Sequence, residues 1–398
     1  MQENNVSIIS KCCGCGTCAL VCPTNAISLQ KNEYGFIVPK VCFDLCIQCG
    51  RCLKKCAYSR SILNNSPLEV YAVAANDDIC NSASGGAFAT AAKAIINLGG
   101  VVYGAAYNCL GENISVGHRR VDALTELQPL LGSKYVQSNA SLVYKSVRDD
   151  LNNNVLVLFS GTPCQVDALY SFLGKEYNNL FTMDLICHGV PSEQFFQDYC
   201  SSAEKQFRFR ITKVKFRDKK FGWNLFGSIE GNRRGKIISI PLLENQSSYY
   251  HLFLHGLSYR DCCYECKYAS NNRVGDITIG DYWGIKKQHP EFFDKEDIFD
   301  EKKGISCLIV NTEKGSNLFW LLSDNVKFAR SSIEKVSANN KQLNEPSVWT
   351  ETRDEVLGIY KSRGYKAVEK WFAKRQGRAY IKQTVKLSLK SLLTKLVW

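Results

Sequence analysis

The sequence predicts an α/β protein with a small α+β module at its N-terminus and a helical, basic tail at its C-terminus. Three observations predict this: cysteines crowd residues 1–60, apolar strands alternate with helical segments over 68–330, and lysines gather in 331–398. A chain of 398 residues has room for about two or three domains. We treat 68–151 and 152–330 as two parts of one central domain.

The N-terminal segment has the cysteine spacing of a bacterial two-cluster ferredoxin. The run C-x-x-C-x-x-C-x-x-x-C occurs twice, over residues 12–22 and 46–56. In such modules the fourth cysteine of each run ligates the cluster of the other run. The predicted ligands of the first 4Fe-4S cluster are Cys12, Cys15, Cys18 and Cys56, and those of the second are Cys46, Cys49, Cys52 and Cys22.

This spacing has a physical reason. Thiolates two residues apart on a tight loop reach three corners of one cubane, and Gly14, Gly16 and Gly50 let backbone N–H groups approach the sulfides. Short strands are expected over Ala26–Leu29 and Phe36–Val38. Zinc knuckles or a disulfide-rich module are the alternative, but a zinc site needs only four ligands, so eight in this register favour iron.

Composition indicates a globular protein whose thiols stay reduced. Hydrophobic residues make up 45% and charged residues 22%. With no signal-peptide pattern and no apolar run of about 18 residues, the clustered cysteines suit a cytoplasmic location. Of the net charge of +12, residues 361–398 supply +10, from eleven Lys/Arg and one Glu. The rest is near balance, so we expect no nucleic-acid partner.

The first part of the central domain contains two loops that we single out. We expect a strand over Val70–Ala75, a helix over Ala87–Leu98 and another over Leu142–Leu151. The Gly-rich loop 82–86 precedes the first helix and offers free N–H groups to a phosphate, although a simple turn explains the glycines as well. In the loop 132–138, Lys134 and Tyr135 suit a phosphate and a ring, and a solvated loop explains them nearly as well.

The second part carries another set of cysteines. Val155–Phe159 and Thr182–Ile186 read as apolar parallel strands, followed by Cys164 and Cys187 respectively. Parallel strands place both thiols at one edge of the sheet, the usual ligand position in open α/β folds. Pro163 starts the helix that holds Cys164. A C-x-x-C pair follows at Cys263 and Cys266.

Three interpretations compete for these cysteines. Cys164 and His188 suit a nucleophile and its base. Alternatively, Cys164, Cys187, Cys263 and Cys266 bind a third cluster or a structural zinc, or they are inert core thiols. Four ligands favour a metal over the nucleophile, and the two upstream clusters favour iron. The other seven cysteines are taken as structural: Cys13, Cys42, Cys80, Cys109, Cys200, Cys262 and Cys307.

Four motifs resemble the coenzyme F420 hydrogenase/dehydrogenase beta subunit family. They are Ser-Gly-Thr-Pro-Cys-Gln (160–165), Asp-Leu-Ile-Cys-His-Gly-Val-Pro (184–191), Cys-Tyr-Glu-Cys (263–266) and Gly-Asp-Ile-Thr-Ile-Gly-Asp-Tyr-Trp-Gly (275–284). The loops 82–86 and 132–138 resemble its N-terminal portion. The resemblance covers residues 1 to about 330, whereas the basic tail lies outside the family pattern.

The resemblance implies FAD and a third 4Fe-4S cluster bound by Cys164, Cys187, Cys263 and Cys266. It implies FAD contacts for Ser84, Gly85, Gly86, Gly132, Ser133, Lys134, Tyr135, Gly161 and Thr162. Such proteins move electrons between a hydride carrier, reduced coenzyme F420 or a similar one, and clusters through the flavin. The doublets Cys12-Cys13 and Cys262-Cys263 leave the choice of ligand open at each place, and we assign no catalytic side chain.

The tail is expected to form helices over Tyr360–Trp371 and Tyr380–Trp398. In the second, apolar residues recur every three or four positions and lysines line another face. Peripheral contact with an anionic membrane, at its inner cytoplasmic face, is one interpretation, and packing on the domain or on a partner is the other.

The sequence therefore predicts an iron–sulfur flavoprotein oxidoreductase whose partner is a redox protein or a soluble hydride carrier. An electron-transfer subunit that has no substrate of its own and docks on a catalytic partner is the alternative. An accessory protein of a biosynthetic pathway is a further one.

Overall fold

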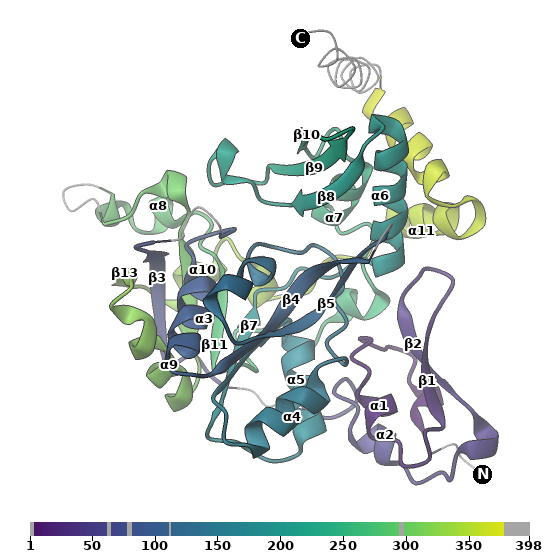
Figure 1. Ribbon diagram of the computed structural model, residues 1–398, viewed down its shortest axis with the longest axis horizontal. Coiled ribbons are helices and arrows are strands. Elements are labelled where there is room, and N and C mark those ends of the chain that lie inside the picture. The colour runs from purple at the N-terminus through teal and green to yellow at the C-terminus, as the bar shows by residue number, and fades with distance from the viewer. Residues whose placement is uncertain (1–3, 62–64, 78–81, 111–112, 294–297, 378–398) are drawn as a thin grey trace.

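The computed structural model describes residues 4–61, 65–77, 82–110, 113–293 and 298–377 (Figure 1). Within them the strands form three sheets, of two, three and eight strands. The eight-stranded sheet lies at the centre, with the N-terminal module at one end and the three-stranded sheet above it in the view of Figure 1. The predicted combination of an α+β module with a mixed α/β domain is confirmed.

The central sheet joins strands from both parts of the central domain. Its strand order is β13-β3-β12-β11-β7-β6-β4-β5. The bounds are β3 (Glu69–Ala75), β4 (Val101–Leu110), β5 (Asn113–Val121), β6 (Val157–Gly161), β7 (Leu180–Leu185), β11 (Ile277–Asp281), β12 (Ser306–Val310) and β13 (Val326–Arg330). The four middle strands β4, β6, β7 and β11 run parallel, and the flanking strands pair antiparallel.

The parallel core of the sheet positions the site. β6 and β7 are hydrogen-bonded neighbours in parallel register, and β11 pairs in parallel with β7. Their carboxyl ends, Gly161, Leu185 and Asp281, therefore meet at one edge of the sheet, where open α/β folds bind ligands. The prediction that the loops carrying Cys164 and Cys187 share this edge is confirmed.

Helices cover both faces of the sheet. On one face α3 (Ala87–Asn97) and α9 (Glu313–Ser323) bury alanines, Leu318 and Phe319 against the strands. On the other face lie α4 (Tyr144–Asn152) and α5 (Pro163–Leu173). α5 begins with Pro163 and with a capping box in which the side chain of Gln165 accepts a hydrogen bond from the N–H of Thr162.

The N-terminal module consists of a hairpin and two short helices. β1 (Ile27–Lys31) and β2 (Ile37–Val41) pair antiparallel, close to the predicted strands, and Gly35 turns the chain at a φ of +78°. α1 (Thr17–Leu20) and α2 (Arg51–Lys54) contain the third cysteine of each run. Cys15, Leu20 and Ala57 pack in the same apolar cluster as α4 and α5, so the module lies directly against the central domain.

A second layer, unforeseen from the sequence, is formed largely by the segment between β7 and β11. The strands β8 (Arg210–Lys215), β9 (Gly227–Arg233) and β10 (Lys236–Leu242) form an antiparallel sheet. The helices of this layer are α6 (Glu193–Phe207), α7 (Ser248–Leu254) and α11 (Glu351–Arg363). All of these elements share one large aromatic cluster with β5.

The start of the tail packs onto the body. Two further short helices, α8 (Ile285–Gln288) and α10 (Ile333–Ser337), precede it. The prediction of one helix over Tyr360–Trp371 is wrong: α11 ends at Arg363, Gly364 adopts a φ of +70°, and a new helix spans 365–377. Gly tolerates this left-handed backbone, which stops the helix. The predicted helix Tyr380–Trp398 lies outside the described residues.

Among the described residues, no helix combines the length and the apolar character needed to cross a lipid bilayer.

Candidate cofactor and metal sites

A cavity of about 320 Å³ opens at the carboxyl edge of the parallel strands. Its walls come from the loops 82–89, 130–138, 160–165 and 185–190, and from 262–269 and 279–283. A volume of this size lies in the range of small-molecule and cofactor sites. The tertiary structure thus gathers around one space the loops and cysteines that the sequence singled out separately.

Eight of the nine residues predicted to contact FAD line this cavity, the exception being Gly85. A Cβ atom on Gly85 would lie 2.2 Å from the carbonyl oxygen of Val73, so this glycine lets the loop pack against β3. The neighbouring Gly86 caps α3 at a φ of +86° and leaves the first N–H groups of that helix facing the cavity side. Such a terminus favours an anionic group.

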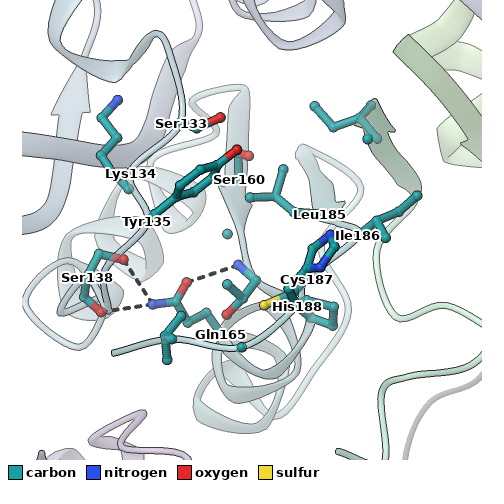
Figure 2. A pocket seen from close by; sticks show the side chains of 18 of the residues that line it. Ser133, Lys134, Tyr135, Ser138, Ser160, Gln165, Leu185, Ile186, Cys187 and His188 are labelled. Atoms are coloured by element: carbon teal, nitrogen blue, oxygen red, sulfur yellow. Dashed lines mark hydrogen bonds between the residues drawn. The ribbon is translucent and has the colours of Figure 1, made fainter. Parts of the chain in front are cut away.

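Gln165 ties two walls of the cavity together (Figure 2). Its Nε2 donates to the carbonyl oxygen of Ser138 at 2.9 Å and to the Ser138 hydroxyl at 3.1 Å, while its Oε1 accepts from the N–H of Thr162 at 3.0 Å. The loop 132–138 is therefore fixed to the start of α5. A polar side chain this deeply buried must have such partners, because unpaired it would cost about 1–3 kcal/mol.

His118 on β5 also links the loop 132–138 to the end of β6. Its Nε2 lies 3.0 Å from the carbonyl oxygen of Ser160, and its Nδ1 lies 3.2 Å from the Ser138 hydroxyl. A carbonyl accepts only, so Nε2 carries the proton and Nδ1 accepts from Ser138. The ring stacks on Phe159, and burial lowers the pKa of His118 to about 4, which keeps the imidazole neutral.

Lys134 and Tyr135 lie on the wall formed by the loop 132–138 (Figure 2). The Lys134 ammonium donates to the carbonyl oxygen of Leu131 at 2.9 Å, and burial lowers the pKa of this lysine to about 7. The Tyr135 ring stacks on Phe253 with centroids 4.1 Å apart. Lys134 is therefore a cation that an anionic ligand would stabilise.

The four cysteines predicted for a third cluster also line the cavity. Burial, and then the neighbouring thiols of Cys263 and Cys266, raise the pKa of Cys187 to about 12. Burial and Cys263 raise the pKa of Cys266 to about 11. Thiols that raise one another's pKa lie close together, and a bound metal cation would stabilise their thiolate forms.

The structure distinguishes the two members of the doublet Cys262-Cys263. The Cys262 thiol hydrogen-bonds to Cys263, which lowers the pKa of Cys263 and raises that of Cys262. Cys263 also neighbours both Cys187 and Cys266. Thiolates are the metal-binding form, so Cys263 is the better ligand of the pair.

Cys164 makes its side-chain hydrogen bond to Thr162, with Sγ and Oγ1 3.1 Å apart. Within the described part of the chain no hydrogen bond joins Cys164 to His188, and burial lowers the pKa of His188. This arrangement gives no support to the nucleophile–base interpretation.

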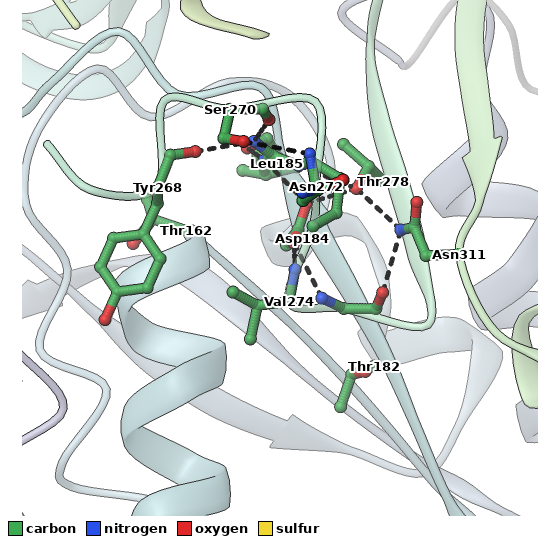
Figure 3. A network of polar contacts seen from close by, with 12 residues as sticks. Thr162, Thr182, Asp184, Leu185, Tyr268, Ser270, Asn272, Val274, Thr278 and Asn311 are labelled. Carbon is green, nitrogen blue, oxygen red and sulfur yellow. Dashed lines mark hydrogen bonds and ion pairs between the residues drawn. The ribbon is translucent and has the colours of Figure 1, made fainter. Parts of the chain in front are cut away.

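A buried ion pair holds the loops that carry the cavity cysteines (Figure 3). Asp184, the last residue but one of β7, binds Arg273 at 2.9 Å, and both side chains are almost fully buried. Asp184 also accepts from Thr278 at 2.7 Å and from the N–H of Gly275 at 2.9 Å. Arg273 in turn donates to the carbonyl oxygen of Tyr268, beyond Cys266.

The N-terminal module brings together the ligands predicted for its first cluster. Cys12, Cys15, Cys18 and Cys56 line one small apolar cavity. Burial, followed by the Cys15, Cys12 and Cys56 thiols, raises the pKa of Cys18. The N–H of Gly14 donates to Cys12 Sγ at 3.2 Å, so a backbone donor approaches the sulfur of a predicted ligand.

The ligands predicted for the second cluster lie farther out in the module. Cys52 lies beside Cys49 and packs in the same small apolar cluster as Cys22. The Asn5 side chain approaches Cys46 Sγ at 3.9 Å, and the N–H of Ala26 donates to Cys22 Sγ at 3.2 Å. The individual ligand assignments stay predictions.

Arg260 anchors the module to the cavity wall. Its guanidinium donates to the carbonyl oxygens of Cys12 at 3.0 Å and Ile37 at 2.9 Å, and to Oε1 of Gln137 at 2.9 Å. A Cβ atom on Gly14 would lie 2.6 Å from this guanidinium. Gly14 thus serves the module interface as well as the cluster loop.

Two models of known protein families match separate parts of the chain. Residues 11–59 match the model of a 4Fe-4S dicluster domain. Residues 155–336 match the model of the C-terminal part of the beta subunit of coenzyme F420 hydrogenase/dehydrogenase. The resemblance predicted from the motifs is confirmed, and the chain is an iron–sulfur protein of the oxidoreductase, electron-transfer type.

A similar solved structure is a chain of the F420-reducing NiFe hydrogenase complex from Methanosarcina barkeri, studied with xenon. The two chains are 16% identical, and the alignment covers 74% of this chain and 92% of the other with a TM-score of 0.43. This similarity is too low to support a functional statement. No curated protein sequence matches the chain.

The sequence analysis assigns no role to five residues that build the site: His118, Gln137, Gln165, Arg260 and Arg273. Gln165 is the last residue of the motif Ser-Gly-Thr-Pro-Cys-Gln (160–165), so the sequence contained a sign that it has a role. His118, Gln137 and Arg260 act through partners that lie far away along the chain, such as Ser160 for His118 and Cys13 for Gln137. A single sequence carries no sign of such pairings.

Replacing Asp184 by Ala leaves the buried Arg273 unpaired, so we expect the free energy of unfolding to fall by about 3–5 kcal/mol. Urea unfolding of the anaerobic holoprotein measures this. Asp44→Ala, at an exposed position, is the matched control and should change stability by no more than about 0.5 kcal/mol. Equal effects of the two substitutions would contradict the role of the ion pair.

His118 should make stability depend on pH. Its folded pKa of about 4 lies below the ordinary 6.5, so the unfolded chain binds a proton where the folded chain does not. The stability is complete above pH 6.5 and is lost as the pH falls toward 4, by roughly 2 kcal/mol between pH 7 and 5. Urea midpoints of wild type and His118→Gln should converge as the pH falls; parallel curves would refute this.

Proposed function

We propose that the chain is an iron–sulfur flavoprotein that carries electrons between a hydride carrier and its clusters. The observation that carries the proposal is one cavity that is lined both by the predicted flavin loops and by the four cysteines Cys164, Cys187, Cys263 and Cys266. The family match of residues 155–336 supports the reaction class.

The residues present fit an anionic dinucleotide such as FAD. Lys134 is a half-buried lysine whose acceptor is a backbone carbonyl, and the N-terminus of α3 behind Gly86 offers free N–H groups. Both features favour phosphate oxygens. Tyr135, already stacked on Phe253, supplies an aromatic surface in the same cavity. Gln165 and His118 hold the segments 132–138 and 160–165 together.

The four cysteines that line the cavity form a donor set that fits a 4Fe-4S cluster. Cys263 raises the pKa of both Cys187 and Cys266, so these three thiols are neighbours. Four cysteine thiolates are the ligand set of such clusters. A flavin and a cluster together convert two-electron hydride transfer into single-electron steps. The Asp184–Arg273 pair would hold the cysteine loops in place through that change of charge.

Anaerobic purification followed by iron and flavin analysis tests the proposal. Three clusters imply about twelve irons per chain, together with one releasable FAD. Cys266→Ser should lose about four irons, whereas Cys200→Ser, a buried cysteine of α6, should lose none. About eight irons with zinc in the wild type would contradict the third cluster. Absence of flavin would contradict hydride exchange.

A second candidate is an electron-transfer subunit that docks on a catalytic partner. The exposed loop around the second predicted cluster favours it. Phe43, Leu45 and Ile47 stand 54%, 53% and 63% exposed beside Cys46 and the exposed Cys49. Asn4 hydrogen-bonds to Gln48 of this loop, which places it near the N-terminus, at the outer end of the module in Figure 1.

Charge on this loop suits an acidic partner. The segment 40–54 contains one acidic residue, Asp44, and three basic residues, Lys40, Arg51 and Lys54. Complementary charge speeds association, and an apolar centre excludes water from the contact. Both candidates use the same outer loop, and they differ in whether a soluble carrier reacts at the cavity.

Ile47→Glu places a charge in the centre of the apolar loop, so reduction of an acidic ferredoxin should slow by about tenfold or more. Stopped-flow spectroscopy measures this rate, and a small viologen dye should be reduced as in the wild type. Ile237→Glu, 77% exposed on β10, is the control. If the substitution left the rate of ferredoxin reduction unchanged, this loop would be excluded as the place where electrons leave for the protein acceptor.

A further inference from the structure

Cys13 stands at the boundary between the module and the central domain. It directly follows Cys12 and was assigned to the structural cysteines by its sequence position. Its side chain is 6% exposed, and its carbonyl oxygen accepts a hydrogen bond from Gln137 at 2.9 Å. Gln137 is itself held by Arg260, which also binds the carbonyl oxygen of Cys12. The backbone at Cys13 is therefore fixed from the domain side.

Cys13 lines both of the cavities described above. The small cavity contains the four cysteines predicted for the first cluster, and the large cavity contains the four predicted for the third. Among the described residues that line these two cavities, Cys13 is the only one common to both. Its side chain therefore forms the wall between them.

Cys13 neighbours a predicted ligand on each side. The thiols of Cys15 and Cys164 are both close enough to shift its pKa. Cys15 belongs to the ligand set of the first cluster and Cys164 to that of the third. In the wall between the two cavities, the Cys13 side chain therefore lies next to a member of each ligand set.

We propose that Cys13 is the contact through which single electrons pass between the third cluster and the first ferredoxin cluster. The inference rests on the proposed third cluster. Electron tunnelling falls off steeply across empty space and more slowly through packed atoms, and sulfur is a large, polarizable atom. One electron moves from the reduced to the oxidised cluster, and no bond forms or breaks. Cys13 is thus a positioning residue that is not itself an iron ligand.

The residue that follows Cys13 favours glycine. Gly14 adopts a φ of +71°, and a Cβ atom on it would lie 2.6 Å from the Arg260 guanidinium. In this part of the cluster loop, Cys13 therefore supplies the side chain that lines both cavities. Serine at position 13 would keep nearly the same volume without the sulfur, and alanine would leave a gap.

The test uses the full holoprotein with Cys13→Ser and Cys13→Ala, and Cys200→Ala as the matched buried control. After flash reduction with a soluble deazaflavin photoreductant, freeze-quench electron paramagnetic resonance follows how the electron divides between the clusters. We expect severalfold slower equilibration in both Cys13 variants, a weaker magnetic interaction between the two reduced clusters, and iron content equal to that of the wild type. Cys200→Ala should equilibrate at the wild-type rate.

Other outcomes would overturn the inference in distinguishable ways. Unchanged equilibration and unchanged magnetic interaction in Cys13→Ala, with full iron content, would refute the contact and leave the proposed function intact. Loss of about four irons in both variants would make Cys13 a ligand. A wild type with about eight irons would remove the third cluster, and the inference with it.

Discussion

The buried pair of Asp184 and Arg273 is the interaction on which the site depends. Asp184 stands near the end of β7 and Arg273 in the segment that precedes β11, so the pair joins two parallel strands at the edge where the cavity opens. Two charges in a dry interior stabilise the fold only when every remaining donor and acceptor is satisfied. Thr278, Gly275 and Tyr268 provide those partners.

The same network joins two motifs that stand far apart in sequence. The Asp184 motif contains Cys187, and the segment around Arg273 follows Cys266 closely. Fixing the two segments to each other brings the cysteines of both to one wall of the cavity. Their polar residues would act on the predicted metal site through the backbone, and none of them needs to touch a ligand.

Attachment of the N-terminal module is the second constraint. Arg260 and Gln137 bind carbonyl oxygens of the first cysteine loop, and Thr17 and Ser171 add hydrogen bonds between the module and α5. These contacts order the predicted centres in space: the cavity, then the first ferredoxin cluster, then the outer loop with Ile47. A ferredoxin joined by a flexible linker would not have this order.

The sequence by itself determined what depends on local spacing. The cysteine runs, the two strands that precede Cys164 and Cys187 (to within two residues at each end), and the Pro163 start of α5 are encoded within about ten residues each, so pattern and turn chemistry sufficed. Only the tertiary structure decided what depends on distant partners: the aromatic layer with β8–β10, the shared wall at Cys13, and the proximity of Cys263 to Cys187. These depend on packing between segments that lie as far apart in the chain as Cys12 and Arg260, and no local period records such contacts.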